Sequence, residues 1–135
     1  MSEQVFAVIN RAEEKREAVS ALCSFVMQHY KIGEEKTFYL KLVLNELIDN
    51  SLRCQSGCSQ VRTVAEIKLS PFTRGVNITI SDSGAGFNPK ETLKRLKEDI
   101  ESCLECGRGL LLVREISRSM KFNKRGNRVS VDMKL

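Results

Sequence analysis

Residues 76–86 read VNITISDSGAG, and the interpretation of the whole chain starts from this stretch. Apolar and polar residues alternate through residues 76–81, which predicts a β-strand with one buried face. The strand ends at Asp82, and a carboxylate fixed at a strand end can accept a hydrogen bond from an exocyclic amine. Gly84 and Gly86 then allow the backbone to turn sharply and to approach a flat ligand closely. By itself, this pattern is just as typical of a tight turn.

A long helix is predicted upstream of that strand, over residues 34–54, directly after Gly33. Within it, Glu46 and Asn50 are four residues apart and therefore lie one turn apart on the same face. An amide at the edge of an apolar surface needs a partner, because an unsatisfied one costs ~1–3 kcal/mol. That partner can be a neighbouring strand or a ligand. The buried side of the helix is predicted to comprise Leu40, Leu44, Leu47, Ile48 and Ser51.

Downstream of the strand, Gly107-Arg108-Gly109 interrupts the chain before an apolar helix predicted over residues 110–120. Two glycines at the start of a helix favour an anion site, because free N–H groups and the positive end of the helix dipole face the ligand. A GxG alone is a weak signal. The order and spacing of the three segments together are more specific than any one of them.

The other elements follow from the same periodicities. Further strands are expected over residues 5–9, 61–69, 121–123 and 128–135, and a turn is expected over residues 71–75. A helix capped by Asn10 carries an apolar stripe, and another helix begins at Asn88. The stripe consists of Ala18, Val19, Leu22, Cys23, Val26, Met27 and Tyr30. The order β-α-α-β-β-α-α-β-β predicts an α+β fold, a two-layer α/β sandwich with helices on one face of a mixed, mostly antiparallel sheet. Residues 1–135 form a single domain in this interpretation.

Composition narrows the classes of protein to consider. Hydrophobic residues make up 41% and charged residues 29%, as in soluble globular proteins. No apolar run approaches the ~18–20 residues that cross a bilayer, and no signal peptide is evident, so we expect a cytoplasmic protein without a membrane partner. The net charge is +5, and the densest basic group comprises Arg114, Arg118, Lys121, Lys124, Arg125 and Arg128. We interpret this group mainly as a solvated surface and not as a direct nucleic-acid site.

The five cysteines are expected to be reduced thiols, because the chain carries no export signal. Cys54 with Cys58 and Cys103 with Cys106 leave a four-cysteine zinc site conceivable, although the first pair has helical spacing. His29 is the single histidine and lies beside the first apolar stripe, where we interpret it as a boundary residue and not as a catalyst.

Three of these segments together resemble the nucleotide-binding domain of the GHKL superfamily, which includes DNA gyrase, a heat-shock chaperone and histidine kinases. The Asn box corresponds to residues 46–50, the first glycine box to residues 82–86 and the second to residues 107–110. The likeness thus covers nearly the whole chain. It implies a site for ATP and Mg²⁺, with about residues 87–106 forming a lid that closes over the nucleotide.

At the adenine end, the resemblance implies that Asp82 receives the amino group of the base with help from Ser130. Gly84 and Gly86 would shape the pocket around the base. At the phosphate end, Asn50 would bind Mg²⁺, which prefers oxygen ligands and bridges the phosphates. Glu46 would be the general base. The phosphates would contact the backbone of Gly107, Arg108, Gly109 and Leu110.

A chain of this size most resembles the anti-sigma-factor serine/threonine kinases of bacterial partner-switching systems. Those proteins phosphorylate a STAS-domain anti-anti-sigma protein and alternately hold a sigma factor, and the resemblance implies a homodimer. Two positions differ from the family pattern: Cys54 stands where a histidine is common, and Leu104-Glu105-Cys106 lacks a common arginine. A carboxylate facing the γ-phosphate would repel it. The alternative is a nucleotide-gated binding module of the same fold that transfers no phosphate.

Overall fold

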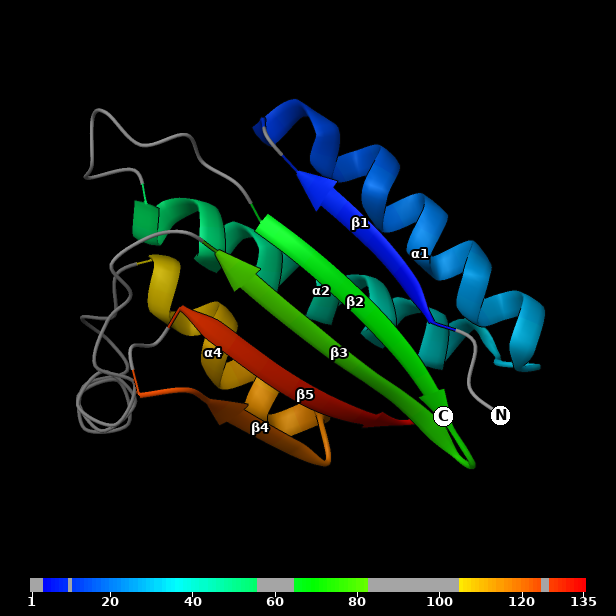
Figure 1. Ribbon diagram of the computed structural model, residues 1–135. Coiled ribbons are helices and arrows are strands. Elements are labelled where there is room, and N and C mark those ends of the chain that lie inside the picture. Colours follow the sequence, from blue (N-terminus) through cyan, green and yellow to red (C-terminus); the bar gives the residue numbers. More distant parts are fainter. Residues whose placement is uncertain (1–3, 10, 56–64, 83–104, 125–126) are drawn as a thin grey trace.

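The computed structural model describes residues 4–9, 11–55, 65–82, 105–124 and 127–135. In these described ranges, three α-helices lie on one face of a five-stranded sheet whose strand order is β1-β2-β3-β5-β4 (Figure 1). The elements are β1 (Val5–Ile9), the 3-10 turn η1 (Ala12–Glu14), α1 (Lys15–His29), α2 (Glu34–Gln55), β2 (Ala65–Phe72), β3 (Gly75–Asp82), α4 (Glu105–Ile116), β4 (Ser119–Phe122) and β5 (Arg128–Lys134). The two-layer α+β architecture is confirmed. The expectation of a mixed sheet is wrong for the described strands, since all four pairings are antiparallel.

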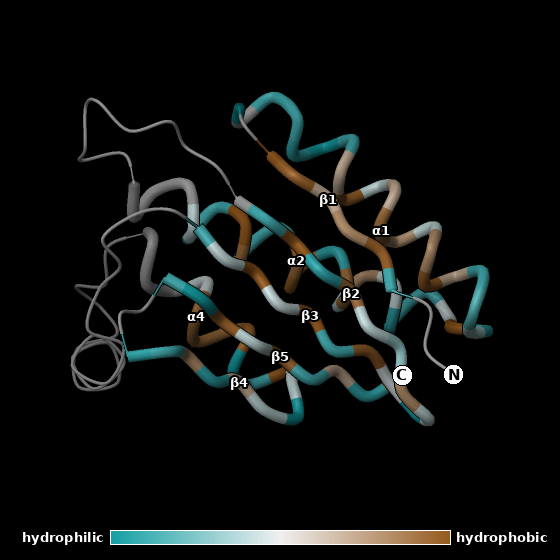
Figure 2. Tube along the Cα trace, in the orientation of Figure 1, coloured by the Kyte–Doolittle hydropathy of each residue, from teal (hydrophilic) through white to brown (hydrophobic). Residues whose placement is uncertain are grey.

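The helix α2 is central to the helical layer and packs against both α1 and α4. Its predicted buried side is confirmed, because Leu40, Leu44, Leu47, Ile48 and Ser51 are all buried. Figure 2 shows hydrophobic residues along the strands and on the helices behind them, as expected when two amphipathic layers close on each other. The core between the layers also takes in Ile9, Val19, Leu22, Cys23, Val26, Val43, Ile67, Leu69, Val76, Ile78, Ile80, Leu110, Val113, Val129, Val131 and Met133.

The hairpin between β2 and β3 is tighter than predicted. Strand β2 continues to Phe72 and β3 begins at Gly75, so the expected five-residue turn shrinks to Thr73-Arg74. Pro71 therefore lies within a strand. This is tolerated because the described part of β1 pairs with β2 only as far as Leu69, so β3 is the one described neighbour of β2 at Pro71.

The first helix also begins later than the sequence suggests. Helix α1 starts at Lys15 after η1, and Glu14 occupies its N-cap position without a side-chain cap bond. The carboxylate of Glu14 instead accepts a hydrogen bond from the backbone N–H of Arg11 at 2.9 Å. Asn10, the predicted cap, lies outside the described residues. Of the apolar stripe, Met27 is wrongly assigned because it is 53% exposed.

Helix α4 is displaced toward the N-terminus relative to its prediction. It runs from Glu105 to Ile116 instead of over residues 110–120, and β4 follows over Ser119–Phe122. Met120 pairs with Val131 in the sheet and is therefore not helical. The error has a simple cause, because a continuous apolar run does not by itself distinguish a helix from a strand. The helix expected from Asn88, and the lid apart from Glu105 and Cys106, lie outside the described residues.

Candidate functional site

The side chain of Glu46 on α2 lies directly against Gly109 on α4. A Cβ atom placed on Gly109 would stand 1.9 Å from Oε2 of Glu46 and 2.8 Å from its Cδ. Both distances are far inside van der Waals contact, so only glycine allows the two helices to approach this closely with the carboxylate between them. The structure thus brings together the predicted general base and one residue of the second glycine box.

A second contact joins α2 to the end of β3. The hydroxyl of Ser51 donates a hydrogen bond to Oδ2 of Asp82 at 3.1 Å, and Ser51 is only 4% exposed. Burying a hydroxyl without a partner costs free energy. A serine in a row of leucines therefore indicates that its hydroxyl has a specific hydrogen-bond partner. The sequence pattern predicts for Ser51 only a place on the buried side of α2. Its polarity at a core position is the signal that could have revealed this contact.

The helix α2 therefore connects the predicted adenine and phosphate ends. Glu46 contacts α4, Ser51 contacts the end of β3, and the half-buried Asn50 lies one turn after Glu46 and directly before Ser51. These residues span less than two helical turns. Helix α2 thus fixes the spacing between the carboxylate of Glu46 and the amide of Asn50. Through Ser51 it also fixes their distance from the carboxylate of Asp82.

The second glycine box is helical and not a loop that precedes a helix. Gly107, Arg108 and Gly109 fall in the opening turns of α4, which begins at Glu105. By helical geometry the N–H of Gly109 bonds to the carbonyl of Glu105, so the unpaired donors of this helix lie before it. The side chain of Leu110 is buried in the core, at 2% exposure. Gly109 thus contributes through close packing, and any anion at this helix end would meet the preceding N–H groups.

Ser130 does not assist Asp82 in this structure, which contradicts its predicted role. Along β5, Val129 and Val131 are buried toward the helices, so Ser130 lies on the open face of the sheet. Its register partner is Thr79, and its Oγ accepts a hydrogen bond from Nδ2 of Asn77 at 2.9 Å. Asp82 is bound to Ser51 from the helical side. The hydroxyl of Ser130 and the carboxylate of Asp82 therefore lie on opposite faces of the sheet.

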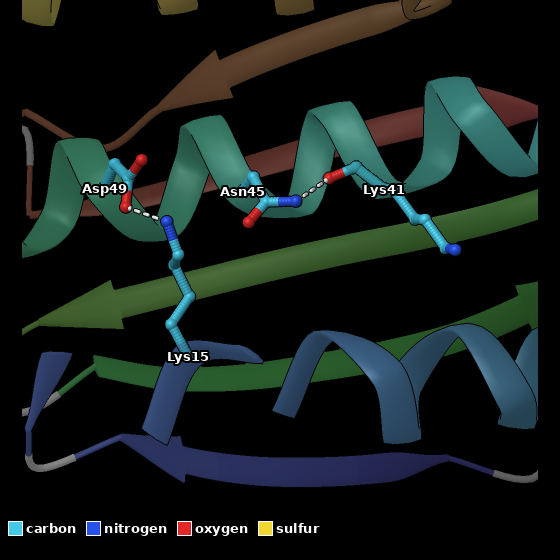
Figure 3. A network of polar contacts seen from close by, with 4 residues as sticks. All are labelled: Lys15, Lys41, Asn45 and Asp49. Atoms are coloured by element: carbon cyan, nitrogen blue, oxygen red, sulfur yellow. Dashed lines mark hydrogen bonds and ion pairs between the residues drawn. The ribbon is translucent and has the colours of Figure 1, made fainter. Parts of the chain in front are cut away.

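An ion pair holds α1 next to this region. Nζ of Lys15 lies 2.7 Å from Oδ1 of Asp49, the residue before Asn50, and the two side chains are 28% and 27% exposed (Figure 3). A partly exposed pair of this kind contributes about 0.2–1 kcal/mol. In the same row along α2, Nδ2 of Asn45 donates to the carbonyl of Lys41. The ion pair stabilises the position of α1 against the functional part of α2.

Cys23 is a buried free thiol whose pKa is raised by burial, with Lys41 acting in the opposite direction, so it behaves as a core residue. Gly84, Gly86 and Cys58 lie outside the described residues. No cluster of three or more His, Cys, Asp or Glu residues suited to a metal occurs in the described part of the chain. None of the described helices is long and apolar enough to cross a bilayer.

Comparison with known proteins agrees with this architecture. A family model described as a histidine kinase-like ATPase domain matches residues 9–134. The matched range includes α2, the end of β3 and α4, which are the three elements that meet around Glu46 and Asp82. No curated protein matches the chain.

Proposed function

Since the chain belongs to the histidine kinase-like ATPase family, we propose that it is a Mg²⁺-dependent protein serine/threonine kinase of a partner-switching system. ATP binding follows from the family. The substrate in this proposal is a STAS-domain anti-anti-sigma protein, and the chain also holds a sigma factor, acting as a cytoplasmic homodimer. Support comes from the contact between Glu46 and Gly109, which brings the proposed base to the start of the helix that would receive the phosphates.

The adenine end of the site is formed by Asp82 in this proposal. Its Oδ2 is bound to Ser51, and its carboxylate would accept a hydrogen bond from the amino group of the base. A carboxylate oriented by a buried donor is better suited to this than one free to rotate, because no binding free energy is then used to fix its position. The half-buried setting of Asp82 keeps such a hydrogen bond partly shielded from water.

The phosphate end is formed by α2 and the start of α4. In proteins, Mg²⁺ is usually bound by oxygen atoms of one or two side chains together with oxygens of the substrate phosphates. In this proposal the amide oxygen of Asn50 is the side-chain ligand. The ion would neutralise charge on the phosphates. Glu46 would take the proton from a serine or threonine hydroxyl of the substrate while the oxygen of that hydroxyl attacks the γ-phosphorus. ADP would leave with the electron pair of the broken P–O bond.

A non-catalytic, nucleotide-gated binding module is the second candidate, and the start of α4 favours it. Helix α4 begins with Glu105, so an acidic residue occupies the first helical turn. A carboxylate this close in sequence to the second glycine box would oppose a bound phosphate.

Phosphoryl transfer distinguishes the two candidates. The purified chain is incubated with γ-labelled ATP, Mg²⁺ and the STAS-domain protein encoded nearby. A kinase produces label on a serine or threonine of that protein, and EDTA abolishes the labelling. If the two proteins form a nucleotide-dependent complex without any labelling, the binding-module alternative replaces the kinase.

Replacing Asp82 by asparagine tests the adenine end. The substitution turns one acceptor oxygen into a donor that opposes the amino group of the base, while Ser51 can still donate to the remaining oxygen. We expect ATP affinity to fall by ~1–3 kcal/mol, or about 5- to 150-fold, without unfolding. Calorimetry on the folded variant measures the change. Wild-type affinity would remove Asp82 from the pocket.

Replacing Ser51 by alanine tests the orientation of that carboxylate. The variant removes the hydrogen bond to Oδ2 of Asp82 and leaves a small space in the core. We expect a loss of about 1 kcal/mol in the free energy of unfolding and a several-fold loss of ATP affinity, smaller than for Asp82→Asn. Chemical denaturation and calorimetry give the two values. An unchanged affinity in a destabilised protein would make Ser51 purely structural.

A further inference from the structure

Five exposed basic residues lie on β4, the strand at one end of the sheet, or on segments next to it in the chain or in the sheet. They are Arg114, Arg118, Lys121, Lys124 and Arg128. Among the described residues the one ion pair joins Lys15 to Asp49, so none of the five is neutralised by a carboxylate of the described chain. Arg128 on β5 donates a hydrogen bond to the hydroxyl of Ser81 on β3, so its side chain is turned away from β4 and the other four residues carry the charge near the β4 edge. Figure 2 shows hydrophilic residues around both ends of β4.

Within the described part of the chain, strand β4 forms the outer edge of the sheet. It bonds to β5 on one side, and no other described strand pairs with it. An edge strand exposes a row of backbone N–H and C=O groups to any extended chain that approaches. Its side chains alternate: Ser119 and Lys121 lie on the open face of the sheet, while Met120 and Phe122 are half-buried toward the helices.

Charged side chains on an edge strand, lysine above all, are a common device against unwanted strand pairing. Here Lys121 is accompanied by Arg118 directly before the strand, Lys124 two residues after it and Arg114 on α4. This excess of unpaired charge would reject a neutral or basic strand and attract an acidic one.

We propose that the β4 edge binds an extended acidic segment of a partner protein, which adds to the sheet as a sixth strand. Carboxylates at alternate positions of the segment face Lys121 and the cations around it. The residues between them are apolar and pack beside Met120 and Phe122. Strand addition supplies affinity through backbone bonds, and the alternating side chains supply specificity.

The geometry favours a protein segment over nucleic acid for two reasons. An extended peptide backbone matches the row of N–H donors and C=O acceptors along a strand edge, whereas a sugar–phosphate backbone has no N–H donors to pair with the carbonyls. Single-stranded nucleic acid also requires exposed aromatic rings for stacking, whereas Phe122, the aromatic residue of β4, is half-buried. This surface lies on the strand and not among Glu46, Asn50 and Asp82, so its function does not depend on kinase activity.

Fluorescence anisotropy tests the proposal directly. The probe is a short labelled peptide of alternating glutamate and valine, compared with its lysine–valine counterpart and with a labelled DNA duplex of similar charge. The full chain should bind the acidic peptide, and binding should weaken several-fold between about 50 and 300 mM salt because exposed charges are screened. The lysine–valine peptide should not bind.

Charge reversal locates the binding surface. Lys121→Glu and, separately, Lys124→Glu should each weaken the acidic peptide about tenfold or more, because each replaces an attraction by a repulsion. Lys36→Glu, an identical change at an exposed position in the first turn of α2, should have no effect. Wild-type binding by both β4 variants, or no binding by the unsubstituted chain, overturns the proposal. So does tighter binding of the duplex, or self-association of the chain that Lys121→Glu abolishes.

Discussion

The Glu46→Gln protein is expected to bind ATP nearly as tightly as the unsubstituted chain and to transfer phosphate ~10²–10⁴-fold more slowly. Glutamine has the shape and volume of glutamate and can occupy the same place against Gly109, but it cannot accept the proton of an attacking hydroxyl. The lost interaction exists only in the transition state, so the rate of transfer falls while nucleotide affinity stays. Single-turnover transfer to the STAS-domain protein and calorimetry with Mg·ATP measure the two quantities.

Asp49→Asn is the matched control for this experiment. Asp49 is another carboxylate of α2, three residues from Glu46, but it pairs with Lys15 of α1 and not with α4. Its loss should lower stability by about 0.2–1 kcal/mol and leave the rate of transfer within a few-fold of wild type. If Glu46→Gln transfers phosphate at the wild-type rate, Glu46 is not the base, whatever its position.

The Gly109→Ala protein is expected to lose about 10²-fold in transfer through displacement of the same carboxylate. The added methyl group would stand 1.9 Å from Oε2 of Glu46, so either the carboxylate or α4 must move by more than an ångström. A misplacement of ~1 Å of a reacting group can cost about 10² in rate. ATP affinity should fall less, because the adenine end at Asp82 is unaffected.

Gly33→Ala is the control that separates the displacement of the Glu46 carboxylate from any general effect of replacing a glycine by alanine. Gly33 precedes α2, and a Cβ placed on it meets nothing within 4 Å, so the variant should be as active as wild type. In a helix, alanine is favoured over glycine by about 1 kcal/mol, so any destabilisation of Gly109→Ala must arise from the contact with Glu46. Wild-type transfer by Gly109→Ala would show that this contact does not position the base.

Much of the fold could be predicted because local and global signals agree. The leucine row of α2 and the alternation of β3 each indicate an element, its buried face and its end. For that reason the position of Asp82 at the end of a strand and the shared face of Glu46 and Asn50 followed from spacing alone. The helical layer on a mostly antiparallel sheet followed from the order of the elements.

The remaining features depend on tertiary contacts that spacing does not encode. Ser130 was misassigned because a shift of one residue in a strand changes the face of the side chain, and only the register with Thr79 reveals which face it occupies. The predicted start of α4 differs from the observed one because glycine predicts an interruption, whereas at Gly109 it permits a close contact with Glu46 inside the helix. The ion pair between Lys15 and Asp49 joins residues 34 positions apart, and no local pattern indicates it.

The central claim is that the end of β3 beside α2 binds the base of ATP, and nucleotide selectivity tests it most directly. Calorimetric titrations compare Mg·ATP with Mg·GTP on the unsubstituted chain. Adenine presents an amino group to the carboxylate of Asp82, whereas guanine presents a carbonyl oxygen at the same position, which sets two acceptors against each other. The account predicts one ATP per chain, bound about 5- to 150-fold more tightly than GTP. Equal affinity for the two nucleotides, or no binding of either, would contradict it.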